Sequence, residues 1–304
     1  MIYPCLMTVV DFEKQPRGPD PFEPWKGQQS KFETRLPWDS MRPFNLKLFG
    51  NCLLALVFVS SAFARSGQLD VLAPSTQILV VTTSDWNSVE GSLERYDRSQ
   101  STTSWKKVGG PITVVVGKTG LAWAAGVAPS NDTSVRATSD PVKKEGDGKA
   151  PAGIFRLSSA FGYAGQAQPG WRMPYISLTP TVECVDDTAS KSYNRIVDNR
   201  TVAPDWNSSE RMLRPDELYR WGLVVDHNAD PVTPGSGSCI FMHIWRGPGR
   251  GTVGCTAMPQ DKLELVLAWL DPAKKPLLVQ VPLPQYESLK KRWNLPALPG
   301  SAHR

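Results

Sequence analysis

The chain has 304 residues, with 34 Lys and Arg against 29 Asp and Glu, so its formal net charge is +5. No run of basic residues interleaved with aromatic residues occurs, which argues against binding to nucleic acid. The His and Cys residues show no HxH, HExxH or CxxC spacing, so we expect no metal site.

Residues 41–64 have the three parts of an export signal. Arg42 and Lys47 supply positive charge, an apolar run follows at 48–59, and a small-x-small peptidase site ends at Ala64. The apolar run is shorter than the ~20 residues that a transmembrane helix needs. We therefore expect a signal peptide that is cleaved after Ala64 and a mature protein in the periplasm. An internal hydrophobic helix or a membrane anchor is the alternative.

The segment that precedes this signal, 1–40, carries scattered prolines without helical or strand periodicity. Because a signal peptide begins a chain, we expect Met41 to be the natural start and 1–40 to come from an upstream start codon. Removing 1–64 leaves 240 residues (304 − 64), enough for one sizeable domain. We expect this domain at 74–282 and a proline-containing surface tail at 283–304.

Short apolar runs separated by Pro and Gly predict a mainly β fold with few short helices. One helix is predicted at 259–270, where apolar residues recur at spacings of three and four. We also expect a short helical turn at 208–214 and a long loop at 131–150 that covers a site. The predicted strands are 77–82, 91–105, 111–116, 153–157, 221–225, 239–244 and 276–281.

Three cysteines follow the predicted cleavage site: Cys184, Cys239 and Cys255. In an oxidising compartment an odd number leaves one free thiol or an intermolecular disulfide. We predict that Cys184 and Cys239 form a disulfide and that Cys255 is free.

The segment 237–258 places a histidine and a cysteine in a pattern that suits nucleophilic catalysis. A predicted strand carries His243, a glycine-rich loop follows, and Gly254 and Cys255 lead toward the predicted helix. The positive end of the helix dipole would lower the pKa of the thiol, and the histidine would take its proton and pass it to a leaving amine. Gly254 would allow close approach of a substrate, and backbone N–H groups around it would form an oxyanion hole. The alternative is a structural cysteine and a structural histidine.

The order of His243 and Thr252-Val253-Gly254-Cys255 resembles the signature of L,D-transpeptidase (YkuD-type) catalytic domains. In that family a histidine precedes a Ser/Thr-x-Gly-Cys motif, and the cysteine is acylated. The segment 146–155, GDGKAPAGIF, is similar to the one that precedes a core strand in the family. The resemblance covers roughly 74–282 and implies an L,D-transpeptidase-like β-sandwich or barrel.

The resemblance also implies a reaction. Cys255 would attack the carbonyl between a diamino acid and a terminal D-Ala in a cell-wall tetrapeptide, and His243, oriented by a backbone carbonyl, would protonate the departing D-Ala. The amine of a second stem would resolve the thioester into a cross-link. Peptidoglycan stem peptides would be the partners, no cofactor would be needed, and we expect a monomer. Hydrolysis, as in an L,D-carboxypeptidase or wall-editing hydrolase, is one alternative, and a wall-binding module is another.

The chain departs from the family pattern at two positions near the nucleophile. Val253 stands where the family commonly has His, and Ala257 stands where it often has Arg. Another arginine would then have to hold a donor carboxylate. Arg246 and Arg250 are the candidates because Arg pairs bidentately with carboxylates, although either could be a solvated loop residue.

A second polar group, Asp226-His227-Asn228, ends the predicted strand 221–225. Asp226 and His227 could line the cleft or bind the amine of a substrate. They could equally belong to a turn that is stabilised by the Asp and Asn side chains.

Overall fold

The computed structural model describes residues 72–100, 102, 104–126 and 135–299. All described residues belong to one compact unit. The predicted signal peptide and the segment before it lie outside the described residues. Within the described part, no helix combines the length and the hydropathy of a membrane span.

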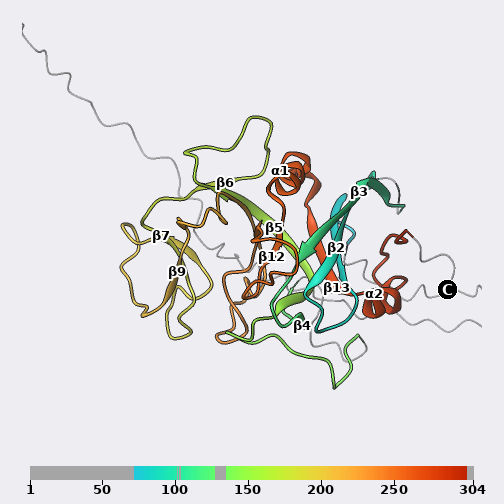
Figure 1. Cartoon of the computed structure of the whole chain (residues 1–304), viewed down its shortest axis with the longest axis horizontal. Coiled ribbons are helices and arrows are strands. Elements are labelled where there is room, and N and C mark those ends of the chain that lie inside the picture. The colour runs from blue at the N-terminus through green and yellow to red at the C-terminus, as the bar shows by residue number, and fades with distance from the viewer. Residues whose placement is uncertain (1–71, 101, 103, 127–134, 300–304) are drawn as a thin grey trace, which may run out of the picture. The chain divides into compact units, whose positions relative to one another are not determined.

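The described residues form a mainly β structure around one barrel-like sheet of ten strands (Figure 1). Its order is β10-β11-β12-β3-β2-β1-β13-β5-β4, with β6 also paired to β5. Because β10 pairs back onto β5, the sheet closes on itself. The strands are β1 (Gln77–Thr83), β2 (Glu90–Asp97), β3 (Lys106–Val115), β4 (Leu121–Trp123), β5 (Ala150–Gly162), β6 (Tyr175–Ser177), β10 (Trp221–Val225), β11 (Phe241–Ile244), β12 (Thr256–Met258) and β13 (Leu277–Pro282).

The closed sheet encloses the main apolar core. Strands β1 and β13 pair in parallel and bury almost every residue, which explains their nearly continuous apolar sequences. Helix α1 (Gln260–Trp269) packs against β10 and β11, and helix α2 (Leu283–Leu289) packs against β13 and β1. A short 3-10 helix, Pro272–Lys274, precedes β13. The predicted helix and the predicted mainly β fold are confirmed, as are six predicted strands; the seventh, 91–105, is a strand only as far as Asp97.

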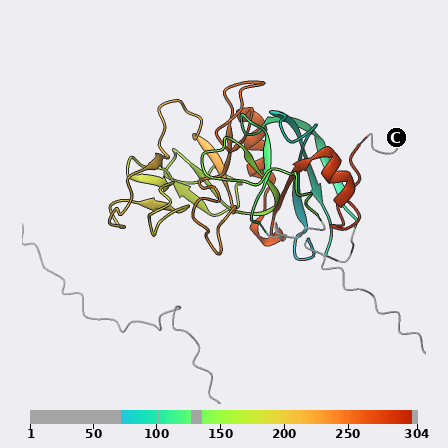
Figure 2. The ribbon, with the colours of Figure 1, turned by 90° about the horizontal axis from the view of Figure 1, so that it is seen from below.

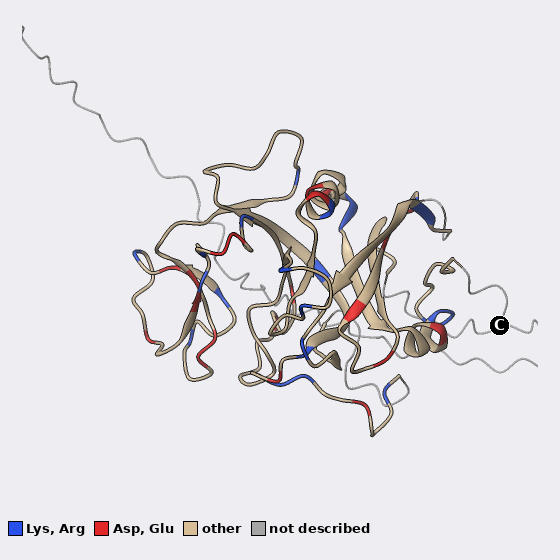
Figure 3. Cartoon of the chain, in the orientation of Figure 1, with Lys and Arg blue, Asp and Glu red and all other residues tan. Residues whose placement is uncertain are grey.

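A second, three-stranded sheet has the order β8-β7-β9 and consists of β7 (Val182–Val185), β8 (Ile196–Asp198) and β9 (Ser209–Arg211). In both views it lies on the opposite side of the large sheet from α2 (Figures 1 and 2). The predicted helical turn at 208–214 is wrong, because β7 supplies the hydrogen-bonding partner that makes β9 a strand. Acidic and basic residues both occur on this small sheet (Figure 3).

The predicted surface tail is also wrong over its described part. Tyr286 and Trp293 are buried in the main core, and the Tyr286 hydroxyl donates to the Pro296 carbonyl at 2.8 Å. Pro284 stands in the first turn of α2, where proline favours a helix. Pro284 therefore marks the start of a packed helix.

Candidate active site

The two residues of the predicted catalytic pair lie on neighbouring strands. β11 and β12 are parallel, with His243 opposite Ala257. Cys255 comes two residues before Ala257, so alternation places all three side chains on one face of the sheet. Residues on this face belong to a second apolar cluster, separate from the main core. The second cluster includes Cys255, Phe241 and both cysteines of the disulfide. Local strand pairing thus brings Cys255 and His243 together.

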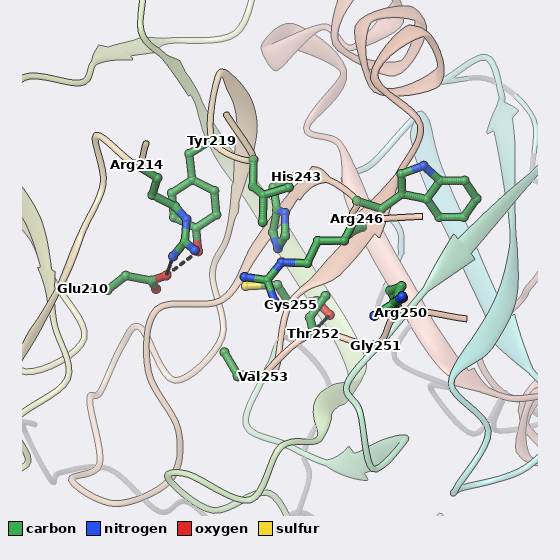
Figure 4. Close-up of a pocket in the computed structure, with 13 residues that line it drawn as sticks. Glu210, Arg214, Tyr219, His243, Arg246, Arg250, Gly251, Thr252, Val253 and Cys255 are labelled. Carbon is green, nitrogen blue, oxygen red and sulfur yellow. Dashed lines mark hydrogen bonds and ion pairs between the residues drawn. The ribbon is translucent and has the colours of Figure 1, made fainter. Parts of the chain in front are cut away.

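His243 and Cys255 line one cavity of about 140 Å³. In the close-up the His243 ring points toward Cys255 (Figure 4). The other lining residues come from β9 and the segment that follows it, from the loop between β11 and β12, and from β12. They are Glu210, Arg214, Leu218, Tyr219, Trp245, Arg246, Arg250, Gly251, Thr252, Val253 and Ala257.

The Cys255 thiol is almost fully buried, with 3% of its surface exposed. Its sulfur accepts a hydrogen bond from the Phe241 N–H at 3.3 Å and lies 3.6 Å from the Cys239 carbonyl. Burial raises the pKa of the Cys255 thiol to about 12, and the Glu210 carboxylate adds to the rise. The resting residue is therefore a neutral thiol.

This state corrects the expectation that the helix dipole lowers the pKa of the Cys255 thiol. Strand β12 lies between Cys255 and α1, which begins only at Gln260. The influence of a helix dipole falls off within about the first turn. Burial of the sulfur is the largest influence on the pKa of Cys255, and it raises that pKa.

His243 is oriented by the backbone. Its Nδ1 lies 2.8 Å from the Ile244 carbonyl, and since a carbonyl can only accept, Nδ1 carries the proton of the neutral ring. Nε2 is then the basic nitrogen. Burial lowers the pKa of His243 to about 4, so the ring rests neutral. The expected backbone carbonyl partner is confirmed, and the structure holds a neutral thiol and a neutral imidazole in one cavity.

The turn before the nucleophile is fixed by Thr252. Its hydroxyl donates to the Cys255 carbonyl at 2.6 Å and accepts from the Gly254 N–H at 3.1 Å. The Thr252 backbone also bonds to Val116 and Lys118 at the end of β3. These bonds position the backbone of Cys255 against the sheet.

Gly254 does not face the cavity in the expected way. A Cβ at this position would lie 3.3 Å from the Ile240 side chain and 3.4 Å from the Lys149 carbonyl. The glycine therefore serves tight packing, which corrects the expectation that it admits a substrate. Its N–H already donates to Thr252, so it could bind an oxyanion only by giving up that bond.

Both predicted arginines lie at the cavity, on its exposed side. The Arg246 side chain is 65% exposed and reaches Asp216 at 3.4 Å; Arg250 is also exposed. A third cation, Arg214, lies deeper: it bonds to Asp216 through two nitrogens at 2.9 and 2.7 Å and to Glu210 at 3.1 Å.

Arg214, Glu210 and Tyr219 are functional candidates that the sequence reasoning missed. Glu210 lies on a strand that was predicted as a helical turn, and the segment that carries Arg214 and Tyr219 shows no catalytic motif. The only hint in the sequence is the proximity of Arg214 and Asp216. An ordinary surface ion pair would look the same in the sequence.

Asp226 and His227 do not lie at this cavity. Asp226 accepts from the Ser158 hydroxyl at 2.6 Å and lines a second cavity, of about 200 Å³. The His227 ring is buried between two backbone carbonyls, and burial lowers its pKa to about 4. The Asn228 side chain bonds in both directions to the Thr233 backbone. The structure therefore corrects the expectation of a role at the cleft and supports the structural turn.

The predicted disulfide between Cys184 and Cys239 is confirmed, and Cys255 is the free cysteine of the described residues. The disulfide ties β7 to the segment that precedes β11. In the small sheet Cys184 lies opposite Glu210. The disulfide therefore holds Glu210 beside the nucleophile.

The predicted covering loop, 131–150, is described from residue 135 onward and contributes no lining residue to the cavity. Among the described residues, no group of three or more His, Cys, Asp or Glu side chains could hold a metal ion. No family model, no curated protein and no solved structure matches the chain.

Proposed function

We propose that this protein is a cysteine acyltransferase of the L,D-transpeptidase (YkuD-type) family that forms peptidoglycan cross-links in the periplasm. The observation that carries the proposal is the shared cavity of Cys255 and His243, with Nδ1 of His243 held by a backbone carbonyl. That arrangement leaves Nε2 as the basic nitrogen beside the only free thiol of the described residues. The closed β sheet is compatible with the fold that the resemblance implies.

The first half of the reaction is acylation. As the Cys255 sulfur bonds to the carbonyl carbon of the donor stem, Nε2 of His243 accepts the thiol proton. The tetrahedral intermediate then expels D-Ala, whose nitrogen takes that proton from Nε2. The product is a thioester on Cys255, with His243 again neutral.

The second half is transfer. The side-chain amine of a second stem attacks the thioester carbonyl and gives up a proton to Nε2 of His243. The sulfur leaves as the new amide forms, and the proton returns to it. Because both groups are neutral at rest, the charge separation arises only during each attack, where the Phe241 N–H stabilises the sulfur.

Recognition of the donor falls to the exposed side of the cavity. Arg246 and Arg250 are the cations at its mouth and would pair with the terminal carboxylate of the donor. Val253 is 71% exposed there and offers an apolar contact. Arg214 is already paired with two carboxylates, so it is a poorer candidate for this task.

The test is a product assay with a synthetic tetrapeptide stem that ends in D-Ala. The protein should release D-Ala and join two stems through their diamino acids, and Cys255→Ala should do neither. Release of D-Ala without a joined product would replace transfer by hydrolysis. No release by a folded protein would contradict the proposal.

A further inference from the structure

Two hydrogen-bonded polar side chains, the buried Tyr219 and the partly buried Glu210, lie beside the nucleophile and take no part in the reaction above. The Tyr219 hydroxyl donates to Glu210 Oε1 at 2.7 Å, an interaction drawn in Figure 4. Tyr219 is only 3% exposed, and its ring packs edge-on against His243 with the centroids 5.1 Å apart. Glu210, Tyr219, His243 and Cys255 line the same cavity.

Charged neighbours and a disulfide-linked strand define the surroundings of Glu210. Arg214 bonds to it at 3.1 Å and places its guanidinium 5.1 Å from the centre of the Tyr219 ring. Asp186, which follows β7, adds a like charge nearby. The disulfide fixes the strand that lies beside Glu210. The Glu210 carboxylate therefore has a defined position in the wall of the cavity.

The polar and charged side chains around Cys255 act in opposite directions on the pKa of its thiol. The negative charge of Glu210 opposes formation of the thiolate, whereas the Tyr219 hydroxyl and Arg214 favour it. His243 faces the thiol as its base. Burial raises the pKa of Tyr219 well above its ordinary value, so its hydroxyl stays protonated and remains a donor.

We infer that Glu210 governs the reactivity of Cys255 through the Tyr219 hydroxyl, so that Glu210 and Tyr219 are positioning residues of the nucleophile. The inference rests on the proposed function in so far as it takes Cys255 to be the nucleophile. When Glu210 is ionised, the Tyr219 hydrogen is committed to the carboxylate, and the negative charge disfavours the thiolate. When Glu210 takes up one proton, its own O–H can donate to the Tyr219 oxygen. The Tyr219 hydrogen is then free to donate to the sulfur as negative charge develops there.

Burial raises the pKa of Glu210 from its ordinary value, so this proton uptake occurs at a higher pH than it would for an exposed Glu. Arg214 acts in the opposite direction on the pKa of Glu210, and Asp186 acts in the same direction as burial. Tyr219 stays neutral throughout, and the one proton that moves comes from solvent and resides on Glu210. The cavity therefore contains coupled titrating groups, among them Glu210, His243 and Cys255.

The experiment is the rate of alkylation of Cys255 by iodoacetamide over a pH series, followed by intact-protein mass spectrometry. Glu210→Gln removes the charge, and its amide N–H can donate to the Tyr219 oxygen as the O–H of a protonated Glu210 would. Alkylation near neutral pH should therefore be faster, by about tenfold for each unit by which the pKa of Cys255 falls. Tyr219→Phe removes the donor, so alkylation should be slower by severalfold. In the double variant the gain from Glu210→Gln should be smaller, because it acts through Tyr219.

Glu217→Gln is the matched control, since Glu217 is an exposed carboxylate on the same segment that pairs with Arg220 and does not line the cavity. It should leave the rate unchanged. An unchanged or slower rate in folded Glu210→Gln overturns the inference, as does a gain that is the same with and without Tyr219.

The unmodified protein gives an independent test that does not depend on any variant folding. While Glu210 ionises, its charge holds back the thiolate, so the logarithm of the alkylation rate should rise with pH less steeply than for a single group. A single-group curve overturns the inference. Alkylation reports on the thiol alone, whereas D-Ala release reports on acyl transfer, so failure of one idea is distinguishable from failure of the other.

Discussion

Loss of the Cys184–Cys239 disulfide should strongly destabilise the fold and disturb the site. The link joins positions that are 55 residues apart. The chain-entropy relation for a loop of that size gives about 4 kcal/mol of stabilisation. We therefore expect Cys184→Ala/Cys239→Ala to lose about 4 kcal/mol of unfolding free energy.

Urea unfolding followed by tryptophan fluorescence measures this loss, with slope and midpoint fitted together. Cys255→Ala is the control, because it removes a buried thiol and leaves the disulfide intact. The double variant should also alkylate Cys255 at a changed rate, since the link holds the strand beside Glu210. A loss below about 1 kcal/mol would refute the reasoning, because the small sheet would then be held by packing alone.

Three other substitutions test separate parts of the structure. Thr252→Val removes the hydroxyl that bonds to the Cys255 carbonyl and the Gly254 N–H. The variant should lose about 1–3 kcal/mol of unfolding free energy, measured with urea, and should release D-Ala more slowly. An unchanged release rate would contradict the positioning role of Thr252. Burial lowers the pKa of His227 to about 4, so an unfolded chain binds its proton first, and unfolding free energy should fall as the pH drops from about 6.5 toward about 4. His227→Gln should reduce that fall by up to about 3 kcal/mol, and an identical pH profile would exclude the buried neutral ring. Trp293→Ala should lose about 3–5 kcal/mol of unfolding free energy in the same assay. A loss near zero would mean that the C-terminal segment lies on the surface.

The elements that the sequence predicts well are those with a strong local pattern. Continuous apolar, β-branched runs mark β1 and β13, and spacings of three and four mark α1. The small sheet has strands of three or four residues with no clear alternation, and its hydrogen bonds come from segments distant in sequence. Strand pairing overrides local propensity in such short segments, which explains why the helical turn predicted at 208–214 is instead the strand β9.

For the candidate site, the sequence reveals the residues with distinctive chemistry and misses their surroundings. Cys255 and His243 stand out by type and spacing. The influence of Glu210 and Tyr219 arises only when the small sheet packs beside β11. The expected direction of the Cys255 pKa shift was wrong for the same reason, because burial depends on tertiary packing that a linear spacing does not contain.

The most direct test of the central claim is intact-protein mass spectrometry of the purified chain mixed with a carbapenem at about neutral pH. A thiol whose proton passes to a neighbouring base attacks such a strained carbonyl and keeps the acyl group. One adduct should form, should map to Cys255, and should be absent from Cys255→Ala and much slower in His243→Ala. If the folded protein gains no adduct, or gains one that Cys255→Ala retains, Cys255 is not the nucleophile.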